Sequence, residues 1–488
     1  MKLNNQSLQQ IKNKNIVNLR LPQYNRTELN IGIVHLGLGA FHRSHQAFYT
    51  EQALNQFGGD WGICAVSMRN KTLQSALATQ DNLYTIAEID QNPGYQVIGA
   101  IKEVLVAAEQ IEQVLDRLTA SSTKLVTLTV TEKGYCLNPK GDLDIKNELI
   151  QADLNHLSAP KSAIGIIVQA LKLRFESDLK PFNIIACDNL PDNGKKLKNA
   201  VTQFANQIDP ALANWIENKV AFPCTMVDSI TPQTDDSTVK LIQTELGFED
   251  LAPVQRESFT QWVIEDCIKD ELPNWEEVGV IFTQDVARYE HAKLRVLNGL
   301  HSAMAYIGSV AGYETVYEAV SDTKIKSFLQ RLLQDEILST IQAPKELNLN
   351  EYADSIIKRF ENPNIKHYLS QIAFDGSIKV PVRSITPLIE RIKSKKSAPL
   401  LSLVVASWIR FLRLKQQAKS QINDPIAIEL NTLLAQFRED ANHDIELFIQ
   451  QCSIFSKESA INNELIKQVS LAYKKVLSDE QNILNALS

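Results

Sequence analysis

The sequence predicts an α/β domain with a largely parallel sheet, followed by a mostly α-helical domain. The chain has 488 residues, which exceeds the roughly 250–300 residues at which a single core stops growing. Short β-branched runs alternate with amphipathic stretches from about residue 31 to 230, as in a sheet covered by helices on both faces. After about residue 284 the strand signals fade and apolar residues recur at helical spacing. We therefore expect domains over residues 1–283 and 284–488.

The expected strands of the first domain are short, apolar and rich in β-branched residues. They cover residues 31–36, 61–67, 95–101, 124–130 and 182–187. Helical patterns over 107–118 and 162–175 separate some of them, and the second domain shows such patterns over 293–308, 325–338, 400–412 and 465–477. Proline, glycine and charged residues near 270–285 indicate the boundary.

Composition excludes several classes of protein. Apolar residues make up 44% and charged residues 22%, as in ordinary globular domains. The net charge of −7 speaks against a nucleic-acid partner, which would require clustered surplus Lys and Arg. The polar start lacks the apolar core of a secretory signal, and no apolar run is long enough to span a membrane. We expect a cytoplasmic protein, a monomer or weak homo-oligomer, with a small-molecule partner.

The cysteines give no sign of a metal or redox site. They are scattered without any C-x-x-C pair, which speaks against a zinc knuckle or a dithiol. We expect no metal and six buried, reduced thiols: Cys64, Cys136, Cys187, Cys224, Cys267 and Cys452.

A glycine pair follows the first expected strand. Gly37 and Gly39 stand where a strand turns into a helix and the backbone can approach a pyrophosphate closely. His42 takes the place of the third glycine of the usual G-x-G-x-x-G pattern, and an ordinary tight turn is the alternative. The position after the first strand of an α/β pattern favours the nucleotide. The first domain is therefore predicted to be a Rossmann-like dinucleotide-binding domain.

The second strand bears on the choice of cofactor. An acidic residue at its end usually binds the adenosine ribose, but Arg69 follows the strand here. A basic residue can accept the 2′-phosphate of NADP, and it can equally be a solvated surface residue. We expect NAD, with NADP not excluded.

A dense polar cluster opens the second domain. Lys293, Asn298 and His301 are separated by five and then three residues, which on an α-helix spreads them over about 140° of one side. A lysine in a desolvated site can give or take a proton near neutral pH without a metal. On spacing alone, a solvated lysine and a core-edge histidine are the better interpretation.

This segment resembles the K-x-x-x-x-N-x-x-H signature of the polyol-specific long-chain dehydrogenases, the family of mannitol 2-dehydrogenases and fructuronate reductases. The resemblance covers nearly the whole chain beyond residue 30. It includes IVHLGLGAFHRSHQAFYTE, LTVTEKGYC, ACDNLPDNG, FPCTMVDSITP, QWVIED and QIAFDGSIKVPVR. Ser258 departs from it, since a proline usually precedes QWVIED in this block.

The resemblance implies a role for each matching residue. Lys293 is the general acid and base, and the reacting oxygen is surrounded by Asn298, His301 and Asn189. The cofactor turn contains Gly37, Gly39 and Phe41, and the nicotinamide half faces Thr131, Glu132 and Asp228. Glu290 matches a carboxylate that exchanges protons with solvent, although a surface glutamate is the alternative.

Within the family, the chain resembles the fructuronate reductase (D-mannonate oxidoreductase) branch most closely. This implies NAD-dependent interconversion of D-fructuronate and D-mannonate in hexuronate catabolism. A uronate needs a partner for its carboxylate, and Lys379 and Arg383 are the candidates, with a solvated basic stretch as the alternative. Two other functions stay open: a mannitol 2-dehydrogenase that uses the same trio, and a nucleotide-binding sensor that has lost catalysis.

Overall fold

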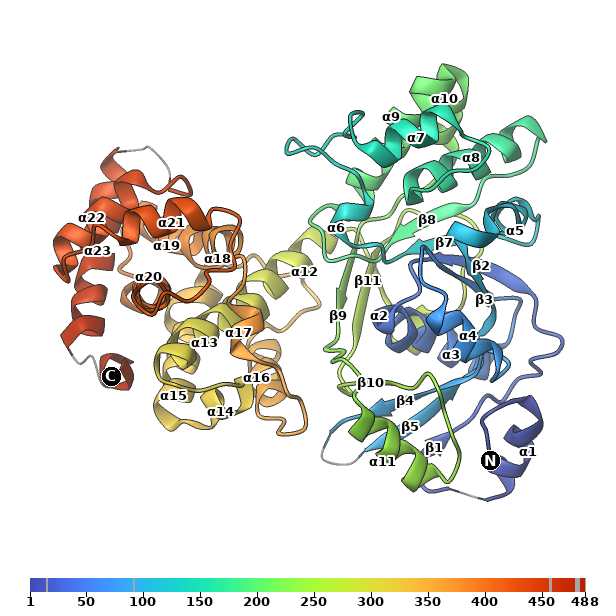
Figure 1. Cartoon of the computed structure of the whole chain (residues 1–488), viewed down its shortest axis with the longest axis horizontal. Coiled ribbons are helices and arrows are strands. Elements are labelled where there is room, and N and C mark those ends of the chain that lie inside the picture. The colour runs from blue at the N-terminus through green and yellow to red at the C-terminus, as the bar shows by residue number, and fades with distance from the viewer. Residues whose placement is uncertain (15, 91–92, 456–458, 479–482, 488) are drawn as a thin grey trace. The chain divides into compact units, whose positions relative to one another are not determined.

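The computed structural model describes residues 1–14, 16–90, 93–455, 459–478 and 483–487. Backbone contacts divide the chain into two compact units, Met1–Val286 and Ala287–Ser488. Figure 1 shows the elements of both. A parallel α/β unit followed by a helical unit confirms the predicted fold class.

The first unit is built on a five-stranded parallel sheet with the strand order β6-β3-β2-β7-β8. The strands are β2 (Ile31–Leu36), β3 (Gly62–Ser67), β6 (Ile101–Val106), β7 (Leu125–Leu128) and β8 (Asn183–Ala186). The chain enters this sheet at its central strand, β2, and adds β3 and β6 on one side before it adds β7 and β8 on the other. The strand order therefore reverses between β2 and β7. In open α/β sheets, such a switch point is where ligands bind at the carboxyl ends of the strands.

Helices cover both faces of this sheet, which is why its strands are apolar on both sides. Val34 and Leu36 of β2 pack into one core with α5, α8 and α9, whereas Ile33 packs into another core with α3. The helices of this unit are α1 (Asn5–Asn13), α2 (Ala40–Ser44), α3 (Gln46–Phe57), α4 (Thr72–Ala78), α5 (Ala107–Thr119), α6 (Thr131–Gly134), α7 (Glu148–Asn155), α8 (Ala163–Glu176), α9 (Asn193–Ile208), α10 (Pro210–Lys219) and α11 (Asp236–Leu246).

Two smaller sheets complete the first unit. One has the order β1-β5-β4-β10 and the other the order β12-β11-β9. Their strands are β1 (Leu19–Arg20), β4 (Tyr84–Glu88), β5 (Gly94–Ile98), β9 (Thr225–Asp228), β10 (Val254–Arg256), β11 (Gln261–Glu265) and β12 (Ile281–Thr283).

The single strand expected over 95–101 is wrong. Residues up to Ile98 form β5, which pairs antiparallel with β4, and Ile101 starts β6 in the parallel sheet. Between them, the backbone N–H groups of Gly99 and Ala100 each donate to the Glu51 carboxylate at 2.8 Å. Because a buried side chain from α3 binds these two groups, the chain can leave one sheet and enter the next.

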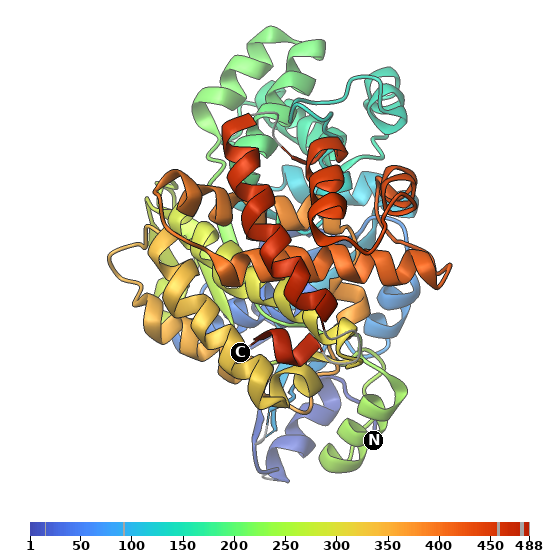
Figure 2. The same cartoon turned by 90° about the vertical axis from the view of Figure 1, so that its left-hand side faces the viewer.

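The second unit is helical. Its longest described helices include α13, α20 and α23; α20 packs against both of the others and crosses α23 in the view of Figure 2. The helices are α12 (Val286–Lys293), α13 (Gly299–Val310), α14 (Val316–Ser321), α15 (Thr323–Arg331), α16 (Leu349–Phe360), α17 (Leu369–Ile372), α18 (Gly376–Val380), α19 (Thr386–Lys393), α20 (Pro399–Gln417), α21 (Ala427–Leu434), α22 (Ala441–Gln451) and α23 (Ser459–Ser478).

Among the described residues, no helix has the length and apolar character of a membrane span. All six cysteines are free thiols. The expectation that every thiol is buried is wrong for Cys267, which is exposed.

Candidate active site

The Gly37 turn lies at the switch point of the parallel sheet. Gly37 has φ +103°, and a Cβ there would lie only 2.1 Å from the carbonyl oxygen of Thr129, just after β7. No side chain fits this approach. Gly39 borders open space, because the closest atom to a Cβ there is the Gly37 carbonyl oxygen at 3.8 Å. Glycine is therefore needed at the two positions for different reasons. Gly37 allows two strand ends to meet, and Gly39 leaves the backbone accessible to a ligand.

His42, at the position of the missing third glycine, is buried and stacks on His35 of β2. The two imidazoles are 3.4 Å apart with an interplanar angle of 12°. His35 is fixed by the hydroxyls of Thr127 at 2.8 Å and Thr129 at 3.0 Å. Burial lowers the pKa of His42 and brings the pKa of His35 to about 3, so both rings are neutral. A flat neutral ring therefore fills the space that the glycine pattern normally leaves to the helix and strand.

Asp188 ties together the ends of β7 and β8. Its carboxylate accepts the N–H of Val130 at 3.1 Å, the N–H of Thr131 at 2.8 Å and the hydroxyl of Tyr135 at 2.9 Å. Thr131 is held at φ +64°, which is unfavourable for a β-branched residue. Burial raises the pKa of Asp188. The carboxylate thus fixes the strained Thr131 backbone next to the exposed Asn189.

The other residues expected at the cofactor are spread over the first unit. Phe41 in α2 is half-buried and stacks on His45 at 4.9 Å. Arg69 is exposed beyond the end of β3, and Glu132 is exposed in α6. Asp228 is buried at the end of β9, in a different sheet. The structure therefore gathers Gly37, Gly39, Thr131, Asn189 and Arg69 at the carboxyl edge of the parallel sheet, and Asp228 lies on another strand end.

In the second unit, the helix expected to carry the catalytic trio is not a continuous α-helix. Lys293 ends α12, a π-helical turn follows over Leu294–Asn298, and α13 contains His301. The N–H of Gly299 donates to the carbonyl of Leu294, five residues back. In this register, residues five apart lie on neighbouring positions of successive turns. Lys293 and Asn298 are therefore closer to one face than the predicted spread of about 140°.

Lys293 and His301 are both buried, each with 8% of its surface exposed. The His301 ring lies 4.7 Å from Phe360 and 5.0 Å from His367. Burial lowers the pKa of His301 well below its usual value, and the charges of His367, Arg359, Arg383 and Lys293 lower it further. Burial and nearby positive charge therefore keep the His301 imidazole neutral.

Arg383 reaches the same region from another π-helical turn, Pro381–Ile385. Its Nη1 donates to the Ser302 hydroxyl at 3.1 Å and to the Asn298 carbonyl at 3.4 Å. The Nζ of Lys379 donates to the Ile372 carbonyl at 3.3 Å. Burial and the charge of Arg383 lower the pKa of Lys379, against the opposite effect of the Asp375 and Asp424 carboxylates. Over the described part of the chain, neither Lys379 nor Arg383 forms an ion pair with a carboxylate. The structure thus brings Arg383 to the backbone of the trio, with Lys379 close by.

The two sets of predicted residues lie in different units. The second unit contains the trio, the half-buried Glu290, Lys379 and Arg383. The first unit contains Asn189 and the expected cofactor residues. Sequence reasoning missed Asp188, His367, Arg359 and Phe360. Asp188 precedes Asn189 inside a motif, which is a usable signal. The other three come from a segment without any pattern that links it to His301.

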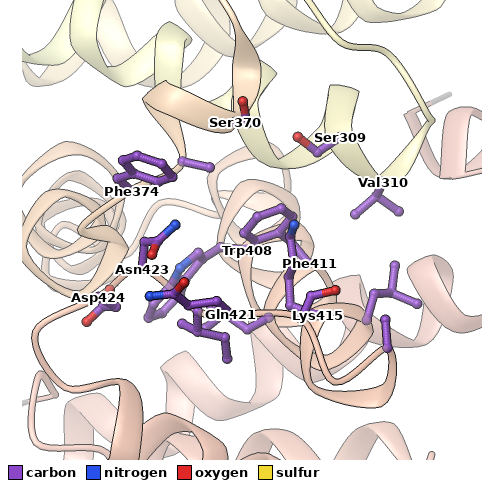
Figure 3. A pocket seen from close by; sticks show the side chains of 16 residues that line it. Ser309, Val310, Ser370, Phe374, Trp408, Phe411, Lys415, Gln421, Asn423 and Asp424 are labelled. Carbon is purple, nitrogen blue, oxygen red and sulfur yellow. The ribbon is translucent and has the colours of Figure 1, made fainter.

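A separate cavity of about 330 Å³ lies elsewhere in the second unit. Figure 3 shows it between Trp408 and Phe411 of α20, Phe374 near α17 and Asn423 of the following loop. None of the predicted site residues lines it. Across the described residues, no group of three or more His, Cys, Asp or Glu side chains is placed to hold a metal ion.

Comparison with known proteins gives matches along most of the chain. A model described as the mannitol dehydrogenase Rossmann domain matches residues 31–277, and one described as the mannitol dehydrogenase C-terminal domain matches 285–477. D-mannonate oxidoreductase of Escherichia coli (strain K12) is 39% identical, over 93% of this chain and 95% of that protein. Mannitol 2-dehydrogenase of Phaeosphaeria nodorum is 36% identical, over 88% of this chain and 77% of that protein.

A solved structure is similar over the same length. The Pseudomonas fluorescens mannitol 2-dehydrogenase ternary complex with NAD and D-mannitol is 32% identical, has a TM-score of 0.83, and matches 100% of this chain and 99% of that one.

Proposed function

The chain belongs to the mannitol dehydrogenase family, and from this premise we propose that it is an NAD-dependent oxidoreductase that interconverts D-fructuronate and D-mannonate. The family makes it an oxidoreductase. The finer choice of a sugar acid over a neutral polyol is carried by one observation: the half-buried guanidinium of Arg383 lies beside the trio and, among the described residues, forms no ion pair with a carboxylate.

Desolvated cations without a counter-ion are costly, and a bound anion removes that cost. The pKa of Arg383 is lowered by burial, which is the sign of such desolvation. A substrate carboxylate supplies the missing charge, and the guanidinium matches its planar shape. D-fructose and D-mannitol have no such group. The similarity to a D-mannonate oxidoreductase supports the same choice.

The residues of the first unit fit a dinucleotide. Gly37 lets β2 and β7 meet, Gly39 leaves backbone accessible, and Asp188 fixes the Thr131 loop at the same sheet edge. We assign the binding of the cofactor to Gly37, Gly39, Phe41, Arg69, Thr131, Glu132 and Asp228. When bound, the nicotinamide supplies or accepts the hydride. NAD is proposed because the similar Pseudomonas fluorescens enzyme was solved with it; the exposed Arg69 leaves NADP as the alternative.

The proton is moved by Lys293. In the reducing direction, negative charge develops on the substrate carbonyl oxygen, and the protonated amine of Lys293 donates to it. The amide of Asn298, and that of Asn189 as the family resemblance implies, donates a hydrogen bond to this oxygen; one such donor is typically worth about 2.7–4 kcal/mol. Neutral His301 orients the substrate, and Glu290, one turn before Lys293, exchanges the proton with solvent. A protonated lysine gives this electrophilic help without a metal.

The test is NADH oxidation by the purified protein with D-fructuronate and D-fructose in parallel, each repeated with Lys293→Ala. We expect a preference for fructuronate that the substitution abolishes, and activity that survives a chelator. A preference for fructose would assign the protein to mannitol 2-dehydrogenases, a candidate favoured by the 36% identical relative. Binding of NADH without turnover of either sugar would favour the sensor.

A further inference from the structure

The orientation of the His301 ring is set by ring packing. In the part of the chain that the structure describes, neither ring nitrogen of His301 makes a hydrogen bond to the protein. Functional histidines usually have one nitrogen held by a backbone carbonyl or a carboxylate, which fixes the ring and its tautomer. Here Phe360 lies against the ring at 4.7 Å with an interplanar angle of 39°, and His367 meets it nearly edge-on at 5.0 Å and 78°. These two contacts take the place of the hydrogen bond.

His367 is held firmly by its backbone. Its N–H donates to the Ile365 carbonyl at 3.0 Å, and its carbonyl accepts the N–H of Val316, the first residue of α14, at 3.0 Å. Next to it, the N–H of Leu369 donates to the Glu314 carbonyl at 2.9 Å. The loop before α17 is thereby attached to the start of α14 at His367 itself and at Leu369, on both sides of Tyr368. The His367 ring therefore packs against His301 from a fixed backbone position.

The charges around the pair explain why no carboxylate holds either imidazole. The positive charges of Lys293, Arg359 and Arg383 lower the pKa of His301, and the charge of Lys379 lowers the pKa of His367. A carboxylate at His301 would attract these cations and compete with an anionic substrate for them. A neutral aromatic contact fixes a ring without bringing in a charge.

We propose that His367 is a positioning residue: it holds the His301 ring in the orientation that His301 needs to align the substrate. The proposal rests on the proposed function, since His301 has a substrate to align only in an active enzyme. His367 acts through His301 by its ring shape. A phenyl ring at position 367 therefore replaces it, and a methyl group does not.

The first test is a double-mutant cycle, measured by NADH oxidation with D-fructuronate. We expect His367→Ala to lower kcat by about 10- to 100-fold with KM changed less than about threefold, because small misplacements of a positioning group cost this much. His367→Phe should restore kcat to within about threefold. In a His301→Ala background, His367→Ala should have no further effect, since coupled residues are not additive. The exposed His156 gives the control His156→Ala, which should match the parent.

Additive effects of His367→Ala and His301→Ala, or a failure of phenylalanine to rescue, would overturn the proposal. If the unsubstituted protein prefers fructose, the proposed substrate is wrong, and the same cycle run with fructose still decides the role of His367.

A second measurement does not depend on activity. In protein labelled at the ring carbon of histidine, the signal of His301 is the one lost in His301→Ala. We expect this signal to shift or broaden in His367→Ala and to recover its position in His367→Phe. An unchanged signal in His367→Ala would show that the ring is held in some other way.

Discussion

Glu51 of α3 is a buried carboxyl group. Its Oε2 accepts the N–H groups of Gly99 and Ala100 and the hydroxyl of Tyr24, each at 2.8 Å. Burial raises the pKa of this carboxyl from 4.5 to about 7, against the effect of these hydrogen bonds. Between these two pH values, the unfolded chain has released the proton and the folded chain has kept it. The free energy of unfolding therefore falls as the pH rises through this window.

Glu51→Gln removes this titration and keeps an oxygen that can accept the same hydrogen bonds. We expect the unsubstituted protein to lose stability relative to Glu51→Gln between pH 5 and pH 8, by about 1–3 kcal/mol, since each pKa unit corresponds to about 1.4 kcal/mol. Calorimetric melting of both proteins at the two pH values measures this. Because other groups titrate equally in both proteins, a melting difference that is the same at pH 5 and pH 8 would contradict the buried titration.

At the residue scale, the sequence predicts those residues whose role depends on their neighbours along the chain. Gly37 could be predicted because a strand-to-helix turn needs an open backbone, and the structure adds that Thr129 leaves no room for a Cβ. His367 could not, because it lies in the loop before α17, its partner His301 lies in α13, and only tertiary packing brings the two rings together. The roles of Lys293 and Asn298 stay predictions, which kinetics must test.

At the scale of elements, the sequence conceals the π-helical turns over Leu294–Asn298, Leu332–Ile337 and Pro381–Ile385. The apolar spacing around Lys293 fits an α-helix almost as well, because one inserted residue shifts the pattern only locally. The first and the last of these turns pack closely: a Cβ at Gly299 would lie 3.6 Å from the carbonyl oxygen of Arg383. The strand expected over 95–101 failed for a similar reason, since the buried Glu51 that ends it comes from another element.

Pro381 opens the π-helical turn Pro381–Ile385, and it lacks the N–H that an α-helix would use there. Pro381→Ala restores this donor and allows the α register. We expect Arg383 to lose its bonds to Asn298 and Ser302, and kcat/KM for D-fructuronate to fall about tenfold while that for D-fructose changes little.

Pro399→Ala is the matched control for this change. Pro399 is exposed at the first position of α20, where the missing N–H has no partner in any case. It should leave both values of kcat/KM as they are. An unchanged substrate ratio in Pro381→Ala would show that the turn does not place Arg383.

At the scale of the whole molecule, the order of strands and helices was predictable from periodicity, because parallel strands buried on both faces and amphipathic helices have different patterns. The three-sheet arrangement of the first unit was not, since strand pairing between distant segments leaves little trace in a single sequence. The same limit applies to the proposed substrate: the family follows from many motifs, but the proposal of a sugar acid depends on Arg383 forming no ion pair in the folded chain.

The ratio of kcat/KM for D-fructuronate to that for D-fructose, measured in the unsubstituted protein and in Arg383→Gln, tests this selection most directly. We predict a ratio well above one that falls about 10- to 100-fold in Arg383→Gln. A hydrogen bond to a charged group contributes about 1.5–3 kcal/mol, and the substitution removes it only for fructuronate, because fructose has no carboxylate. A ratio below one in the unsubstituted protein, or an equal loss with both sugars in Arg383→Gln, would contradict the assignment of a sugar acid as substrate.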